Sequence, residues 1–175
     1  GDLAIRGVRG LSLFAEYLNN PQATADAFDE HGYFLTGDRV RIAEDGTLFF
    51  ADRSKDMLKV GGENVAASEV EAVIQKVADV VEVAVVGARD PMLDEVPVAF
   101  VRLRDGFAGD PAAVLEQVRA ACKHALADFK QPRSVRLVED FPRATLEKIA
   151  KAKLRAQLEA EAEAEAEADD ATRQR

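Results

Sequence analysis

The sequence predicts an α+β protein, and three observations carry that prediction. Residues 1–52 are rich in short strand patterns, whereas from Asp52 onward apolar β-branched runs alternate with amphipathic helical patterns. A densely charged stretch near residues 52–55 separates the two parts. With 175 residues, 47% of them hydrophobic, the chain is long enough for one ordinary domain or two small ones with a real core.

The first part predicts strands joined by turns. A strand is expected over residues 2–6, ending at Gly7, and a short helix over 24–28 after an Asn-Pro turn. The Asp45-Gly46 pair lies between two apolar runs and predicts a β-hairpin.

The second part alternates between strand and helix patterns. Ser68 and Glu71 have the spacing of a capping box, which predicts a helix over 68–77. Asp110-Pro111 predicts a second helix start, as N-cap and first-turn proline. The remaining elements are buried strands over 80–86 and 96–103, a short strand over 135–138 and a last helix from about Glu147.

Composition excludes several classes of protein. The formal net charge is -9, and no basic stripe is present that would suit a nucleic acid. No apolar run approaches the roughly 20 residues of a membrane span. The lone Cys122 allows no internal disulfide, which favours a reducing, cytoplasmic compartment, and beside His124 it lacks the further ligands that a metal site needs. The first residue is Gly, so we expect a piece of a longer polypeptide.

Residues 159–175 form an acidic tail that begins with a strict Glu-Ala alternation. Alanine favours helix, but glutamate at every second position places like charges at i,i+4. We therefore expect this tail to be disordered or a frayed helix.

Four clusters contain residues that could take part in catalysis or ligand binding. They are Asp38 behind a glycine turn, the charged run with Arg53, Lys55 and Lys59, the turn Gly61-Gly62-Glu63-Asn64, and Lys148 at the end of Pro142-Arg143-Ala144-Thr145-Leu146-Glu147-Lys148. Taken singly, each has a common structural explanation as a turn, a solvated charge run, a plain loop or an exposed lysine.

In this order and at these spacings the clusters resemble the adenylate-forming (AMP-binding) superfamily, which includes acyl-CoA synthetases, peptide-synthetase adenylation domains and luciferases. The resemblance covers residues 1–158. It implies that residues 1–52 are the end of a large AMP-binding N-terminal domain. Residues 53–158 are then a small mobile C-terminal domain with a mixed sheet flanked by helices. The phosphate loop, the acyl pocket and the Mg²⁺ ligands are expected upstream, so this chain alone is expected to be inactive.

The resemblance also implies roles in adenylate formation. Asp38 corresponds to the residue that accepts the ATP ribose hydroxyls, and a carboxylate suits them because it offers only acceptors. Arg53 is expected at the ribose or phosphates, and Lys55 at the hinge between the two domains. Lys148 corresponds to the catalytic lysine, which bridges the substrate carboxylate and the α-phosphate. Lys151 and Lys153 are the fallback candidates, because Glu147 stands where the family usually has glycine.

A second set of residues is expected to serve thioester formation. Gly62, with Gly61 and Glu63, corresponds to the pantetheine tunnel of CoA, where a Cβ would obstruct the thiol arm. Lys59 lies on the same face and is expected to assist this second step catalytically.

The leading hypothesis is an ATP-dependent carboxylate–CoA ligase, whose substrates are a carboxylic acid, ATP and CoA. The sequence Gly61-Gly62-Glu63-Asn64 favours the acyl-CoA synthetase branch. The motif that ends at Lys148 is similar to that of ligases for carnitine-like betaine acids. Two alternatives remain open: an adenylation domain that loads a carrier protein, and a non-catalytic domain that binds or regulates a partner. Whether the protein forms a homodimer is also left open.

Overall fold

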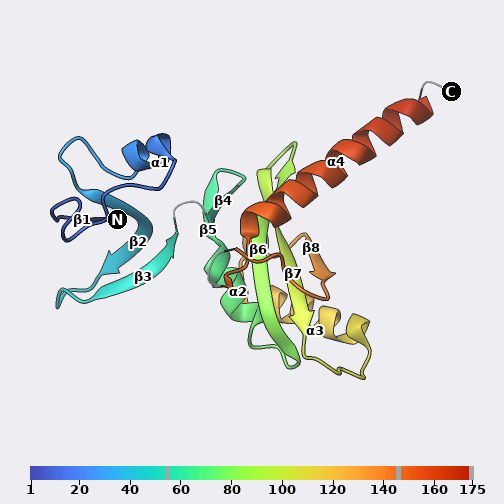
Figure 1. The fold of residues 1–175 in the computed structure, drawn as a ribbon. Coiled ribbons are helices and arrows are strands. Elements are labelled where there is room, and N and C mark those ends of the chain that lie inside the picture. The colour runs from blue at the N-terminus through green and yellow to red at the C-terminus, as the bar shows by residue number, and fades with distance from the viewer. Residues whose placement is uncertain (54–55, 145–146, 174–175) are drawn as a thin grey trace. The chain divides into compact units, whose positions relative to one another are not determined.

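The chain forms two compact units, Gly1–Asp56 and Met57–Arg175, in a computed structural model that describes residues 1–53, 56–144 and 147–173 (Figure 1). The division falls just beyond the boundary predicted near residues 52–55. Each unit has its own sheet.

The first unit is built on an antiparallel sheet in the order β1-β2-β3. Its strands are β1 (Asp2–Ile5), β2 (Phe34–Ile42) and β3 (Leu48–Arg53). The predicted hairpin between β2 and β3 is confirmed. Gly46 takes a φ of +84° in its turn, a conformation that glycine adopts without a steric cost.

The short helix α1 (Pro21–Asp26) begins three residues before the predicted range. The side chain of Asn20 caps it by accepting a hydrogen bond from the Ala23 amide at 3.0 Å, and Pro21 occupies the first helical position. The Asn-Pro pair is therefore the start of the helix rather than a preceding turn. Aromatic rings with centroid separations of 4.8–5.8 Å pack in this unit, namely those of Phe14, Tyr17, Phe28 and Phe34.

The second unit holds a mixed five-stranded sheet, as the fold prediction requires. Its strands are β4 (Met57–Val60), β5 (Glu63–Ala66), β6 (Val80–Asp90), β7 (Asp94–Leu103) and β8 (Ser134–Leu137). β7 lies at the centre. It pairs antiparallel with β6 along one edge, and on the other edge it pairs antiparallel with β4 and parallel with β8.

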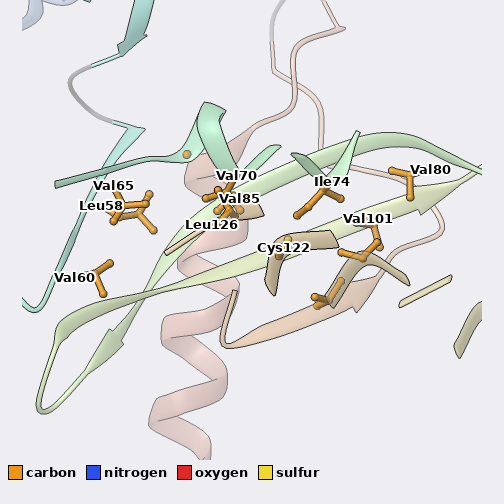
Figure 2. Packing of buried hydrophobic residues seen from close by; sticks show 14 of the residues in the cluster. Leu58, Val60, Val65, Val70, Ile74, Val80, Val85, Val101, Cys122 and Leu126 are labelled. Carbon is orange, nitrogen blue, oxygen red and sulfur yellow. The ribbon is translucent and has the colours of Figure 1, made fainter. Parts of the chain in front are cut away.

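Both faces of β6 and β7 are buried. Val85 and Ala99 are cross-strand neighbours that join one core cluster with α2 (Ala67–Ile74) and α3 (Pro111–Ala125). Figure 2 shows this cluster, with Val70 and Ile74 of α2 and Cys122 of α3 around the strands. The alternate residues belong to a second cluster, which consists of Ala84, Val86, Val98, Phe100, Phe141, Leu154 and Leu158. The strands therefore have the continuous apolar sequence that a sheet covered on both faces requires.

The two predicted helix starts in this unit have different outcomes. The start of α3 is confirmed, because the Asp110 side chain caps it by accepting from the Ala112 amide at 2.9 Å. The predicted capping box of α2 is wrong: the N-cap is Ala66, which makes no side-chain capping bond. The Glu71 carboxylate instead accepts a hydrogen bond from the Val85 amide at 2.7 Å, so a contact with β6 replaces the local one.

The last helix, α4 (Lys151–Arg173), begins four residues later than the sequence predicted. It continues through the Glu-Ala segment, for which disorder or fraying was expected. Leu154 and Leu158, four residues apart, bury one face of its first turns, and Arg136 pairs with Glu161 beyond them. Packing and alanine propensity together thus outweigh the charge repulsion in the described helix. Among the described residues, no helix has the length and apolar content needed to cross a membrane.

Candidate functional site

Lys148 lies on a short hairpin-like segment that leads into α4. The Ala144 amide donates to the Lys148 carbonyl, and the Ala150 amide donates to the Pro142 carbonyl, both at 2.7 Å. Arg143 and Ile149 form an antiparallel bridge between these bonds. Residues 145–146 of the tip lie outside the described residues. The Lys148 side chain is exposed, so its ammonium is available to a ligand.

The backbone immediately before this lysine suits glycine, the residue that the resemblance leads us to expect there. Glu147 has a φ of +58°, in the left-handed region where a Cβ is unfavourable. The chain turns there, so that the Lys148 carbonyl lies opposite the Ala144 amide and accepts its hydrogen bond. Glu147 therefore holds a backbone conformation that is strained for a residue with a Cβ.

An ion-pair network holds the Arg143 side of this segment. The Arg143 guanidinium donates to both carboxylate oxygens of Glu82 on β6, at 2.7 and 2.9 Å, and to Asp140 at 3.0 Å. Arg102 donates to the same Glu82 at 2.7 Å. These bonds, that from Arg143 foremost, lower the pKa of Glu82 to about 2, and burial only partly opposes them. In return, hydrogen bonding to Glu82 raises the pKa of Arg143. The pair therefore stays charged at any physiological pH.

The two fallback candidates, Lys151 and Lys153, differ from Lys148 in exposure or in position. Lys151, the first residue of α4, pairs with Glu71 at 2.7 Å, and both side chains are about four-fifths buried, with relative exposures of 19% and 20%. Lys153 is exposed, but it lies inside α4 rather than on the segment that the motif defines. The geometry therefore favours Lys148 among the three candidates.

The second set of predicted residues surrounds the turn between β4 and β5. Gly61 and Gly62 have φ values of +59° and +88°, and a Cβ on Gly62 would meet no atom within 4 Å. The turn therefore requires glycine for its backbone, and open space lies beside it. Glu63 is exposed at the start of β5.

Lys59 is exposed on β4, next to a cavity of about 760 Å³. Its backbone amide donates to the Glu95 carboxylate at 2.8 Å, which ties β4 to β7. The cavity is lined by Met57, Lys59, Arg89, Asp90, Pro91, Asp94 and Glu95. The structure thus brings Lys59 to the same end of the sheet as the glycine turn.

The first unit carries two of the three predicted nucleotide-binding residues, Asp38 and Arg53. The register of β2 and β3 places Asp38 directly opposite Arg53. Asp38 is half-buried, and its amide donates to the Thr36 hydroxyl at 3.1 Å. The Arg53 side chain and the predicted hinge residue Lys55 lie outside what the structure describes. The pairing of β2 with β3 is therefore the observation that places Asp38 and Arg53 next to each other.

Sequence reasoning missed the residues that hold the Lys148 segment in place. Glu82 and Glu71 lie in apolar stretches far from the motif, and no local pattern marks their partners. A charged residue within the buried run 80–86 was the one available signal, since a carboxylate there requires a cationic partner.

In the described part of the chain, no group of three or more His, Cys, Asp and Glu residues is placed to hold a metal ion.

Comparison with known proteins defines the class. Residues 69–148 match the AMP-binding enzyme C-terminal domain family. The chain is 39% identical over 148 residues to a 2-succinylbenzoate–CoA ligase of Geobacillus kaustophilus, covering 85% of this chain and 29% of that protein. It is 36% identical over 155 residues to a crotonobetaine/carnitine–CoA ligase of Citrobacter koseri, covering 89% and 29%. The crystal structure of ATP-bound MatB from Rhodopseudomonas palustris matches with a TM-score of 0.68 and 35% identity, over 83% of this chain and 28% of that one.

Residues 69–148 therefore match the C-terminal domain of adenylate-forming, AMP-binding enzymes, and the relatives and solved structures that the chain resembles belong to that class. The two relatives named above are CoA ligases, the branch that the glycine turn favoured. The chain spans between a quarter and a third of the length of these relatives, and so represents only their C-terminal part.

Proposed function

We propose that this chain is the C-terminal part of an ATP-dependent carboxylate–CoA ligase. In the first half-reaction, a carboxylate oxygen attacks the α-phosphorus of ATP, and the bond to pyrophosphate breaks to leave an acyl-adenylate. In the second, the CoA sulfur attacks the acyl carbonyl, the thiol loses its proton, and AMP departs. The upstream N-terminal domain would supply the acyl pocket, the phosphate loop and the ligands of Mg²⁺.

In the first half-reaction, Lys148 is the proposed catalytic cation. Two anions, the substrate carboxylate and the α-phosphate, must approach each other, and an ammonium between them offsets their repulsion and stabilises the developing charge. Asp38 would accept hydrogen bonds from the two ribose hydroxyls, with Arg53 opposite it as a second contact to the nucleotide.

In the second half-reaction, the turn of Gly61 and Gly62 would border the path of the pantetheine arm, with Glu63 beside it. The open space next to Gly62 supports this assignment, because a thin thioalkyl chain could lie against bare backbone there. Lys59, at the same end of the sheet, would assist the thiol attack as a nearby cation.

The two sets of residues lie at opposite ends of β6, which favours an alternation of the small domain. The Lys148 segment is attached to Glu82 near the start of β6, and the cavity beside Lys59 is lined by Arg89 near its end. At the rise of an extended strand, these two positions are about 23 Å apart. The two steps at one acyl group therefore require two orientations of the unit, and we propose Lys55 as the hinge.

A single observation carries this proposal: the exposed Lys148 is presented on a segment that is anchored to the sheet. The test is made in the full-length protein with two variants, Lys148→Ala and Gly62→Leu. ATP–pyrophosphate exchange measures the first half-reaction, and thioester formation from supplied acyl-adenylate measures the second. Lys148→Ala is expected to lower the exchange rate by at least about 100-fold, and Gly62→Leu to impair thioester formation chiefly.

Each variant has a matched control. Lys123→Ala removes an exposed lysine from α3, and Gly106→Leu introduces leucine at a glycine with a φ of +68° and open surroundings, a backbone like that of Gly62. Both controls should keep both activities within a few-fold of wild type. An equal loss of both half-reactions in both test variants would contradict the two-orientation mechanism.

Substrate and compartment follow by analogy. We propose a small organic acid, and 2-succinylbenzoate, crotonobetaine and carnitine are the first acids to assay, because relatives are named for them. A cytoplasmic location is proposed because ATP and CoA are the expected co-substrates.

A further inference from the structure

We propose that Glu82, which precedes Arg143 of the lysine motif by 61 residues, is a positioning residue for adenylate formation and determines the position of Lys148 through Arg143. This inference rests on the proposed ligase function. It concerns how the lysine is held, and it assigns a purpose to a partly shielded carboxylate that no step of the reaction uses.

The contact between Glu82 and Arg143 is of the kind that fixes orientation as well as distance. Two parallel bonds of 2.7 and 2.9 Å join the guanidinium fork to both carboxylate oxygens. The two side chains retain only 24% and 28% of their exposure, so water screens the pair less than a surface pair. Arg102, on the neighbouring strand β7, holds Glu82 from a second direction at 2.7 Å. The carboxylate is therefore itself fixed in place.

Arg143 transmits this fixed position to Lys148. Its guanidinium also donates to the Glu147 carbonyl at 3.4 Å, on the residue immediately before the lysine. Its backbone lies opposite Ile149, the residue immediately after the lysine. Arg143 therefore touches both sequence neighbours of Lys148, and a shift of its side chain would displace the lysine.

The strain at Glu147 makes this support necessary. A non-glycine residue at a φ of +58° is expected to relax unless the surrounding contacts hold it. The bonds from Arg143 to the Glu147 carbonyl and from Ala144 to the Lys148 carbonyl are the contacts that do so among the described residues. Loss of the Glu82 anchor would release the first of them.

The other end of the segment is attached to the same strand. Lys151 pairs with Glu71, and the Glu71 carboxylate accepts from the Val85 amide, both at 2.7 Å. The segment is thus bound to β6 at Glu82 and, through Glu71, at Val85. Two attachments to one strand keep Lys148 fixed to the unit, which a lysine delivered by a domain rotation requires.

The experiment compares Glu82→Gln, Arg143→Gln and the double variant with wild type in the full-length protein. The acids are 2-succinylbenzoate, crotonobetaine and carnitine, and Glu116→Gln is the matched control, because Glu116 pairs with Arg119 on α3 in the same unit. For each protein, we would measure kcat and KM for ATP in pyrophosphate exchange, thioester formation from supplied acyl-adenylate, and the thermal midpoint Tm.

If Glu82 positions Lys148, Glu82→Gln lowers the exchange kcat by about 10-fold to 100-fold, since a misplacement of about 1 Å can cost that much. KM for ATP and thioester formation should stay within about threefold of wild type. The double variant should be no worse than the poorer single one, because both changes break the same connection. Glu116→Gln should match wild type.

The inference is overturned if Glu82→Gln retains the wild-type exchange kcat while Lys148→Ala loses it. It is also overturned if Glu82→Gln lowers both half-reactions in parallel with Tm, which is the signature of a purely structural residue. Failure of the ligase proposal is distinguishable, because wild type itself would then show no pyrophosphate exchange with any carboxylic acid.

Discussion

At the scale of single residues, Glu147 shows that a residue with a Cβ can occupy a backbone conformation that suits glycine. The left-handed backbone before Lys148 is held by two hydrogen bonds, from the Ala144 amide to the Lys148 carbonyl and from the Arg143 guanidinium to the Glu147 carbonyl. Glycine is the residue that suits it, because an L-residue with a Cβ costs roughly 1–2 kcal/mol there.

We therefore expect Glu147→Gly to stabilise the 175-residue chain. Relief of the strained φ outweighs the extra backbone entropy of glycine in the unfolded state, for a net gain of about 0.5–1 kcal/mol in the free energy of unfolding. Urea denaturation followed by circular dichroism measures it. Ala156→Gly, at an exposed position within α4, is the control and should lose about 1 kcal/mol. A loss of stability in Glu147→Gly would show that the side chain contributes more than its backbone costs.

Whether a candidate site residue could be predicted from the sequence depends on how far away in the chain its partner lies. Lys148, Gly61 and Gly62 were predicted because each lies in a short motif. Glu82 was not, because its partner Arg143 lies 61 residues away, and no periodicity reveals such a pairing. The roles of all the predicted site residues remain predictions, and for Asp38 and Arg53 the opposed register is what a shared ligand would require.

At the scale of elements, apolar patterning predicted the strands well. The runs that became β6 and β7 were predicted as buried strands, and they are longer than expected because their polar ends also pair, down to Asp90 and Asp94. Local capping rules were less reliable. They gave α3 correctly but failed at α2, where Glu71 is engaged by the Val85 amide and Lys151. A tertiary contact outcompeted the local one, which the sequence of a single helix cannot show.

Helix α4 should depend on its two buried leucines rather than on its charged repeat. Leu154 is 2% exposed and packs in the cluster with Phe100 and Phe141. Leu154→Ala is therefore expected to lower the free energy of unfolding by about 2–4 kcal/mol. Lys153→Ala, one residue earlier and exposed, should change it by less than about 0.5 kcal/mol. Thermal or urea unfolding of both variants provides the comparison, and similar values for the two would contradict the assigned packing of α4.

At the scale of the whole molecule, the second unit has the features of an independently folding domain. Both of its core clusters consist of residues from Leu58 onward, and its sheet is complete within it. The sequence predicted a boundary close to the observed one because composition changes there from strand-rich to alternating patterns. The proposed role of the unit in catalysis could not be predicted from composition, since it depends on residues far apart in the chain.

We expect a polypeptide of residues 57–175 to fold alone. Its unfolding should be cooperative, with a Tm within about 5 °C of the corresponding transition in the 175-residue chain, because the interactions that define its cores are retained. Differential scanning calorimetry of the two polypeptides makes the test. The Leu154→Ala form of the shorter polypeptide is a useful control, since it should melt at a lower temperature. A non-cooperative transition in residues 57–175 would show that the first unit contributes to the stability of the second.

Cys122 is the one cysteine of the sequence, and it lies in the core between α3 and the sheet (Figure 2). Burial raises the pKa of its thiol, which disfavours the thiolate that alkylating reagents attack. The buried position and the raised pKa therefore both slow the alkylation of this sulfur while the core remains folded. Cys122 can thus serve as a built-in probe of unfolding. The rate at which a maleimide or iodoacetamide alkylates its sulfur reports how often the core opens to solvent.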